Sequence, residues 1–201
     1  MNLVIIKYNA GNIQSVLYAL DRIGVQAKVT DDVAEIQQAD KVIFPGVGEA
    51  SSAMRYLKER GLDVVIKNLK QPVLGICLGM QLMCRFSEEN DVDCLNIFDE
   101  DVKYFGKAAN VDNRLKIPQI GWNNIYDLKS PLFDNVPHNS YTYFVHSYYA
   151  ALGEHTIATT NYVIPYSSAL HKDNFYGTQF HPEKSAGVGE QILKNFAQLI
   201  N

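Results

Sequence analysis

Two glycines that flank a cysteine, in the stretch Gly75-Ile76-Cys77-Leu78-Gly79, set the strongest limit on how this chain can fold. An apolar run at residues 72–74 precedes the stretch, and a run of helix-forming residues at 80–86 follows it. The pattern is the cysteine counterpart of a nucleophile elbow, in which a strand turns sharply into a helix. A side chain in place of either glycine would crowd such a turn. The sequence therefore predicts a strand, a strained turn at Cys77 and a helix in direct succession.

The predicted turn sets Cys77 at the N-terminus of the helix. Unpaired backbone N–H groups at that end favour a negative charge, and so favour the thiolate, which is the nucleophilic form of cysteine. We expect the N–H of Leu78 to point to the place where an oxyanion would form on a substrate. Gln81, one helical turn later, is expected on the same face, within reach of that substrate. The alternative is a buried cysteine that only fills space.

Strands and helices alternate in the first half of the chain. We expect strands at residues 3–7, 25–29 and 41–44 and helices at 12–23, 33–38, 49–60 and 62–69. This alternation predicts a parallel sheet with helices on both faces. The second half is rich in β-branched and aromatic residues, and we expect it to extend the sheet with antiparallel strands. These are predicted at 121–126, 141–151, 155–161, 167–172 and 174–180, before a closing helix at 188–200. The sequence therefore predicts one α/β domain over residues 1–201 with a mixed sheet.

Composition narrows the possible functions. The net charge of −4, without blocks of like charge, argues against nucleic acid or an anionic membrane surface as a partner. The N-terminal region has only four consecutive apolar residues, too few for a signal peptide or a membrane span, so we expect a cytoplasmic protein. Three unevenly spaced cysteines argue against disulfides, and no paired Cys or His spacing indicates zinc. We expect neither a metal nor another cofactor.

A cysteine nucleophile needs a base that is itself held in place. Of the five histidines, His181 has the best context, because Pro182 favours an extended backbone before it. Residues two apart in an extended segment point the same way, so Glu183 can direct its carboxylate at the His181 ring. His146 is a weaker candidate, and we interpret it as structural. The loop Pro45-Gly46-Val47-Gly48 follows a predicted strand and is expected at the carboxyl edge of the sheet, where it could supply a second oxyanion donor.

An elbow cysteine followed much later by His-Pro-Glu is similar to the class I (triad) glutamine amidotransferases, whose triad is matched by Cys77, His181 and Glu183. Other segments resemble one branch of that family, the glutaminase subunits of imidazole glycerol phosphate synthase. These segments are residues 8–16, 44–48, 77–82, 118–123, 143–148 and 180–185. The first loop departs from that branch, because Lys7 and Asn9 replace its usual Asp and Gly. The departure bears on partner contacts near Asn12 and not on the triad.

The resemblance implies a flavodoxin-like fold and hydrolysis of glutamine through a thioester on Cys77, with His181 as acid and base. It implies an oxyanion hole completed by the Gly46-Val47 peptide, which must turn its N–H inward. It also implies that ammonia passes to a (β/α)₈-barrel synthase subunit, the partner in a heterodimer. That subunit would make imidazole glycerol phosphate and an aminoimidazole carboxamide ribotide for histidine biosynthesis. The positions implied for glutamine binding are Gln81, Glu89 and the backbone of Ser147 and Tyr148, and those implied for the partner interface are Asn12, Trp122, Asn123 and Lys184.

Two other functions stay open. A paralogue that supplies ammonia for the amidination of surface sugars would carry the same motifs, and a stand-alone cysteine hydrolase would need no partner. Hydrolases and chaperones of the DJ-1/PfpI type carry His directly after the nucleophile, where this chain has Leu78. The chain has no phosphate-binding loop or dinucleotide fingerprint with which to use ammonia itself. We therefore expect weak glutaminase activity in the isolated chain, rising strongly when a synthase subunit binds its nucleotide.

Overall fold

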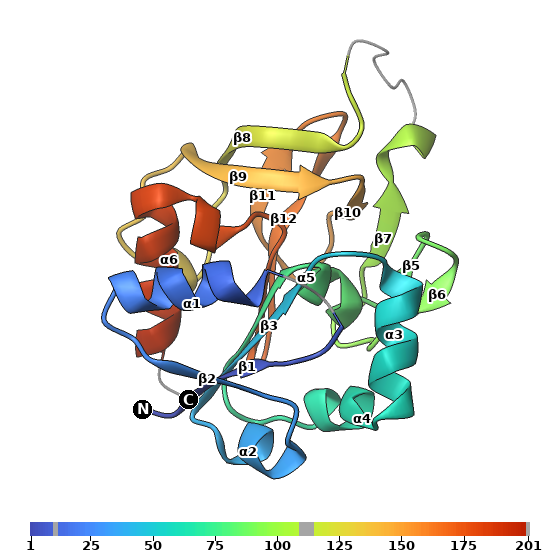
Figure 1. Cartoon of the computed structure of the whole chain (residues 1–201). Helices are drawn as coiled ribbons and strands as arrows, with labels where there is room; N and C mark the ends of the chain where they lie inside the picture. Colours follow the sequence, from blue (N-terminus) through green and yellow to red (C-terminus); the bar gives the residue numbers. More distant parts are fainter. Residues whose placement is uncertain (10–11, 109–114, 200–201) are drawn as a thin grey trace.

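The computed structural model of the chain describes residues 1–9, 12–108 and 115–199. Its main sheet is built from β1 (Leu3–Ile6), β2 (Ala27–Thr30), β3 (Lys41–Gly46), β4 (Val73–Cys77), β5 (Phe86–Ser87), β6 (Val92–Asp93), β7 (Asp101–Tyr104), β10 (Tyr148–Ala150), β11 (Thr156–Asn161), β12 (Pro165–Lys172) and β13 (Phe175–Thr178). The strand order is β2-β1-β3-β4-β13-β12-β10-β7-β5-β6, with β11 beside β12 (Figure 1). The five strands from β2 to β13 pair in parallel, and β13, β12, β10 and β7 then pair antiparallel. The predicted mixed sheet with a parallel centre is confirmed.

Helices cover both faces of this sheet, as predicted. They are α1 (Ile13–Arg22), α2 (Val33–Gln38), α3 (Ala50–Glu59), α4 (Leu62–Lys67), α5 (Leu78–Met83) and α6 (Ala186–Gln198). Helices α1 and α6 lie on one face and α3, α4 and α5 on the other (Figure 1). Alternate residues of β1 enter different cores: Val4 and Ile6 pack with α3 and α4, and Leu3 and Ile5 pack with α1 and α6. Burial on both faces explains the unbroken apolar run of this strand.

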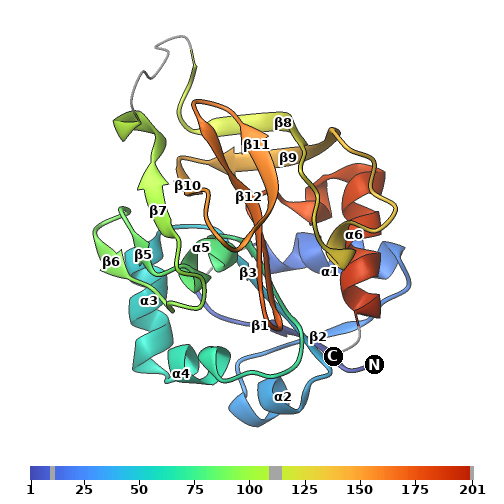
Figure 2. The same cartoon turned by 180° about the vertical axis from the view of Figure 1, so that it is seen from behind.

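The second half differs from the predicted extension of the sheet. The strands β8 (Gln119–Ile125) and β9 (Ser140–His146) pair only with each other, as a separate two-stranded sheet. Figures 1 and 2 both show this pair, called here the β8–β9 ribbon, across the end of the molecule opposite α2 and α4. The segment 141–151 is therefore not one strand, because Ser147 separates β9 from β10. In β9, buried and more exposed residues alternate, so one face packs on the core while the other stays open.

Several smaller elements were not predicted. Strands β5, β6 and β7 have two to four residues each, too few for an alternating pattern to be recognised. Three short 3₁₀ helices also occur, η1 (Phe105–Lys107), η2 (Pro131–Phe133) and η3 (Pro182–Lys184). Of the sequence predictions, the loop residues Ala10 and Gly11 and the end of the closing helix at residue 200 lie outside the described residues. None of the helices in the described ranges has the length and apolar character needed to cross a membrane.

Candidate active site

The predicted elbow is present. Cys77 is both the last residue of β4 and the N-cap of α5, with φ 54° and ψ −108°. A positive φ is unfavourable for a residue with a side chain, so the turn is strained. Both glycines are needed for close packing. A Cβ atom on Gly75 would lie 2.8 Å from the backbone N of Met80, and one on Gly79 would overlap the carbonyl oxygen of Phe44.

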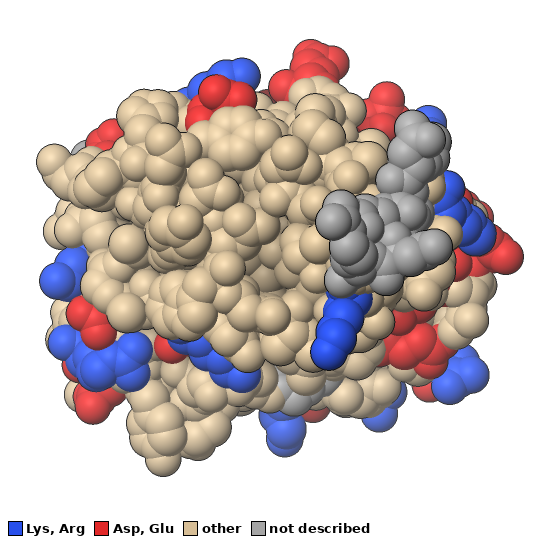
Figure 3. All heavy atoms as spheres, turned by 90° about the horizontal axis from the view of Figure 1, so that it is seen from above, with Lys and Arg blue, Asp and Glu red and all other residues tan. Residues whose placement is uncertain are grey.

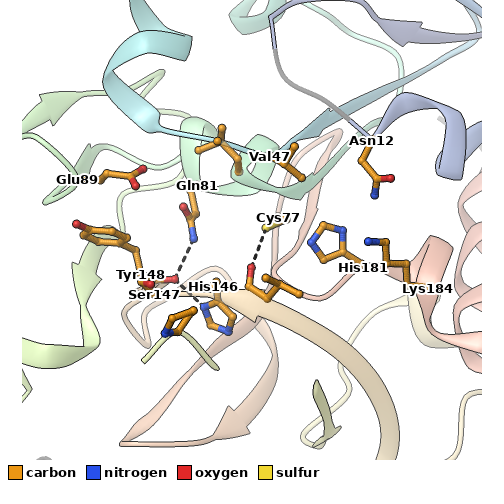
Figure 4. A pocket seen from close by; sticks show the side chains of 14 residues that line it. Asn12, Val47, Cys77, Gln81, Glu89, His146, Ser147, Tyr148, His181 and Lys184 are labelled. Atoms are coloured by element: carbon orange, nitrogen blue, oxygen red, sulfur yellow. Dashed lines mark hydrogen bonds between the residues drawn. The ribbon is translucent and has the colours of Figure 1, made fainter. Parts of the chain in front are cut away.

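His181 and Glu183 lie together beside Cys77. The Nδ1 atom of His181 is 2.7 Å from Oε1 of Glu183, and both residues are buried. His181 has an extended backbone, and Pro182 begins η3 directly after it. Figure 4 shows the His181 ring next to the Cys77 sulfur at one cavity. The elbow and the His-Pro-Glu segment meet because β4 and β13 are parallel neighbours whose carboxyl ends lie at the same edge of the sheet.

The pKa of His181 is raised to about 10. Burial is the largest single influence and acts in the opposite direction, towards a lower pKa. It is outweighed by the negative charge of Cys77, a hydrogen bond to Cys77, and the hydrogen bond and charge of Glu183. The site therefore favours the protonated, imidazolium form of His181 at neutral pH, next to the Cys77 sulfur. This is the arrangement in which the sulfur can attack and the ring can donate a proton.

His146 lies in a different environment. Burial, the largest influence, lowers the pKa of His146 to about 4, and the charge of His181 acts in the same direction. Its Nδ1 is 2.7 Å from the carbonyl oxygen of Tyr148, and its Nε2 is 3.2 Å from the hydroxyl of Tyr166. The ring is thus neutral and held on both sides within the protein. It orders the backbone next to the cavity.

The coupling of Cys77 to His181 can be measured by titration. We expect the His181 ring to titrate near pH 10 in the unmodified protein. In Cys77→Ala it should titrate at distinctly lower pH, because the variant removes the charge and the hydrogen bond that raise this pKa and keeps the burial that lowers it. NMR of labelled histidine rings measures both values. An unchanged His181 titration in Cys77→Ala would show that the two groups do not interact.

The cavity beside Cys77 has a volume of about 490 Å³, within the range usual for small-molecule sites. It brings together most of the residues that the sequence analysis singled out: Asn12, Val47, Gly48, Cys77, Leu78, Gln81, Glu89, Ser147, Tyr148, His181 and Lys184. Gly46 is not among the lining residues of the cavity, and a Cβ atom on it would lie 2.9 Å from Leu78 Cβ. Glu183 lies behind His181, while Trp122 and Asn123 lie on β8 outside the cavity lining.

The loop that was predicted to start at Pro45 starts later, because β3 runs to Gly46. The pairing of β3 with β4 sets Gly46 directly opposite Cys77. Gly48 has φ 117°, a backbone conformation that favours glycine. Val47, between the two glycines, is 38% exposed and lines the cavity. Leu78, the first residue of α5, and Val47 of this loop thus line the same cavity as Cys77.

Polar groups at the other end of the cavity are held by the protein. Gln81 donates from Nε2 to the carbonyl oxygen of Tyr148 at 2.9 Å (Figure 4). The same Nε2 also donates to Oε1 of Gln179 at 2.8 Å. With both amide hydrogens engaged, its carbonyl oxygen is the group oriented for a ligand. Glu89 accepts a hydrogen bond from the N of Ala50 at 2.8 Å. Burial raises the pKa of the Glu89 carboxyl, and the negative charge of Glu49 adds to this effect.

Sequence reasoning missed two contacts that other side chains make with the side chains of the triad. Asn12 donates from Nδ2 to Oε1 of Glu183 at 2.8 Å, although it was singled out only for a partner interface. Gln179 donates from Nε2 to the sulfur of Cys77 at 3.6 Å. A signal for Gln179 existed, because it precedes His181 by two residues and side chains at that spacing in an extended segment share a direction. No comparable local pattern links Asn12 to Glu183, since the two are far apart in the chain.

The cavity opens beside an exposed apolar surface on the β8–β9 ribbon. Ile120, Trp122 and Tyr141 are each more than half exposed, and Val145 is 37% exposed and also lines the cavity. Trp122 contacts Tyr143 edge to face, with 6.0 Å between the ring centroids. Figure 3 shows this end of the molecule, where uncharged residues form the centre and charged residues lie towards the rim. Such a surface is typical of a protein–protein contact.

Comparison with known proteins shows similarity to one family over nearly the whole chain. Residues 4–199 match the family model described as Glutamine amidotransferase class-I. The chain is 60% identical to imidazole glycerol phosphate synthase subunit HisH of Bacteroides fragilis, over 99% of this chain and 100% of that protein. It is 48% identical to the protein of the same name from Haemophilus influenzae, over 100% of this chain and 98% of that protein. A solved structure of a glutamine amidotransferase matches 97% of both chains with a TM-score of 0.72 and 15% identity, a likeness of fold alone.

Proposed function

Because the chain belongs to the class-I glutamine amidotransferase family, we propose that it is the glutaminase subunit of an imidazole glycerol phosphate synthase. It hydrolyses glutamine to glutamate and supplies the ammonia to histidine biosynthesis in the cytoplasm. The full-length identity to subunits of that name supports the assignment. The observation that carries it is the buried His181–Glu183 pair beside an elbow cysteine at the edge of a 490 Å³ cavity.

In the first half of the reaction, the Cys77 thiolate attacks the side-chain carbonyl carbon of glutamine. The oxyanion that forms accepts hydrogen bonds from the backbone N–H of Leu78 and from the Gly46-Val47 peptide once its N–H turns inward. His181, with its raised pKa, gives its proton to the nitrogen as the C–N bond breaks, so that ammonia leaves and a thioester on Cys77 remains. Glu183 stabilises the imidazolium and keeps its ring in place.

In the second half, His181 is neutral after giving up its proton and acts as the base. It takes a proton from water while the water oxygen attacks the thioester carbon. Collapse of this second intermediate breaks the C–S bond, releases glutamate and restores the thiolate beside the imidazolium. One water is consumed, and one ammonia and one glutamate are formed. The same ring serves as acid and then base because its partners hold it in one orientation.

The amino-acid end of glutamine is held away from the sulfur. Glu89 supplies a carboxylate and Gln81 a carbonyl oxygen for the α-ammonium group, both at the end of the cavity near Tyr148. The backbone of Ser147 and Tyr148 completes this part of the site. Contacts at this end align the side-chain carbonyl with the thiolate, which contributes to the rate through orientation.

Ammonia released into neutral water is mostly protonated and is then no nucleophile. We therefore propose that it passes directly to a (β/α)₈-barrel synthase subunit, with which the chain forms a heterodimer. The apolar surface of the β8–β9 ribbon beside the cavity supports this docking. Trp122 and Asn123 lie on β8, and Asn12 and Lys184 lie at the rim of the cavity. A partner seated there would close the cavity against solvent.

The test is to mix the chain with a candidate barrel subunit and its nucleotide substrate and measure imidazole glycerol phosphate formed from glutamine. We expect product from glutamine only with both subunits, and weak glutaminase activity from the chain alone. Full glutaminase activity in the isolated chain would contradict the proposed coupling. Stimulation only by a barrel protein that amidinates a sugar would instead assign the chain to that paralogous route.

Trp122→Ala is expected to weaken binding of the synthase subunit by about 30-fold, because a large exposed aromatic at the centre of an interface contributes strongly to affinity. Isothermal titration calorimetry measures the Kd. Val64→Ala is the control, since Val64 is 60% exposed on α4, at the opposite end of the molecule in Figure 1. Equal Kd values for both variants would remove the β8–β9 ribbon from the interface.

A further inference from the structure

Asn12 makes a contact that its place in the fold does not require. It is the N-cap residue of α1, yet its side chain makes no capping hydrogen bond. Its Nδ2 instead donates to Oε1 of Glu183 at 2.8 Å. The backbone of Asn12 is in the left-handed region, with φ 75° and ψ 13°, which Asn tolerates better than most residues. The conformation of Asn12 therefore serves the contact with Glu183 and not the helix end.

The oxygen that Asn12 contacts is the one that holds His181. Oε1 of Glu183 accepts from Nδ1 of His181 at 2.7 Å and from Nδ2 of Asn12 at 2.8 Å. The other oxygen of this carboxylate, Oε2, is buried and has no hydrogen-bond partner within the described ranges. Both hydrogen bonds therefore converge on one atom. Without the amide of Asn12, His181 would be the remaining side-chain partner of that oxygen in the described structure.

We propose that Asn12 is a positioning residue for the triad. It acts through Glu183, whose carboxylate it holds in the rotation that directs Oε1 at the His181 ring and so keeps that ring aimed at Cys77. The inference builds on the proposed glutaminase function and adds Asn12 to the three triad residues that carry out the reaction. A carboxylate held by two donors has less freedom to rotate than one held by a single donor, and small misplacements of a catalytic base lower the rate strongly.

A contact that merely ties α1 to η3 would behave differently. Its loss would loosen the packing between these elements and lower stability without a selective effect on turnover. Two variants separate these roles. Asn12→Gly removes the amide and tolerates the positive φ. Asn12→Asp keeps the shape of the side chain and its tolerance of this backbone region, but replaces the donor by a carboxylate that opposes Glu183.

We expect Asn12→Gly to lower kcat for glutamine hydrolysis about 10-fold in the complex with the synthase subunit, with KM changed less than about 2-fold. Asn12→Asp should lose at least as much, although it preserves the side-chain volume. Gln14→Ala, an exposed substitution on the same helix, is the control and should keep the unmodified kcat. Thermal unfolding of each variant separates the loss of turnover from a loss of folded protein.

A second readout does not depend on turnover. The proton on Nδ1 of His181, bonded to a buried carboxylate, should give a downfield NMR signal protected from exchange with water. We expect this signal in the unmodified chain and in Gln14→Ala, and its loss or broadening in Asn12→Gly. Unmodified kcat in either Asn12 variant, or a persisting signal in Asn12→Gly, would overturn the inference. If the unmodified chain with its partner releases no glutamate from glutamine, the proposed function fails, while the NMR signal still decides the role of Asn12.

Discussion

Cys77→Ala is expected to lower kcat for glutamine hydrolysis by about 10⁴-fold or more, because no thioester can form without the sulfur. His181→Ala should cause a similar loss, since the thiolate then lacks the imidazolium that stabilises it. The double variant should be no worse than either single one, because groups that act as a unit are not additive. Glutamate release in the presence of the synthase subunit and its nucleotide measures all three rates.

Cys94→Ala is the matched control. Cys94 is partly buried outside the lining of the cavity, and burial raises the pKa of its thiol to about 12, so it stays protonated at neutral pH. We expect this variant to keep the unmodified kcat. Loss of turnover in Cys94→Ala, or a double variant far slower than both single ones, would contradict the assignment of Cys77 and His181 to one catalytic unit.

Gly79→Ala is expected to lower the free energy of unfolding by more than about 3 kcal/mol. This is at or above the largest usual cost of adding atoms to a well-packed core. The added Cβ would overlap the carbonyl oxygen of Phe44 in β3. Backbone atoms of a central strand cannot swing aside as a flexible side chain can, so β3 or α5 must shift. Denaturation by urea, followed by circular dichroism, gives the free energy of unfolding. A shift at this point also moves the loop that begins at Gly46, so activity should fall in the protein that remains folded.

Gly187→Ala tests whether the loss of stability in Gly79→Ala is due to the close packing around Gly79 and not to the exchange of Gly for Ala in general. Gly187 lies in α6, and a Cβ there would meet nothing within 4 Å. Alanine also favours helix over glycine by up to about 1 kcal/mol, so this variant should be as stable as the unmodified chain or slightly more so. If Gly79→Ala were equally stable, the close packing of the elbow would not be a requirement of the fold.

The elbow and the parallel half of the sheet were predictable because they depend on local patterns. Gly75, Cys77 and Gly79 lie within five residues, and the parallel strands β1, β3 and β4 are short apolar runs, each with a helix after it. The contact of Glu183 with His181 was also predictable, because two residues in an extended segment share a direction. In each case the physical cause lies within a few residues of the feature.

The remaining features depend on tertiary packing. The content of β-branched and aromatic residues predicted strands at β8 and β9 but could not say that these strands pair apart from the main sheet, since pairing depends on which edges meet. Asn12 meets Glu183 only because α1 lies beside η3 in the folded chain. The short strands β5, β6 and β7 are held by their neighbours and have little pattern of their own. These tertiary contacts hold the site in place, and no pattern of neighbouring residues in the sequence predicts them.

The most direct test of the account is covalent labelling of the chain by a glutamine-like diazo-ketone, followed by peptide mass spectrometry. This reagent reacts where a nucleophile meets a bound glutamine side chain, so it reports the thiolate and the substrate cavity together. We expect one adduct, on Cys77, which excess glutamine prevents and which His181→Ala slows strongly. An adduct on Cys94 at a comparable rate, or labelling of Cys77 that glutamine does not prevent, would contradict a glutaminase site at this elbow.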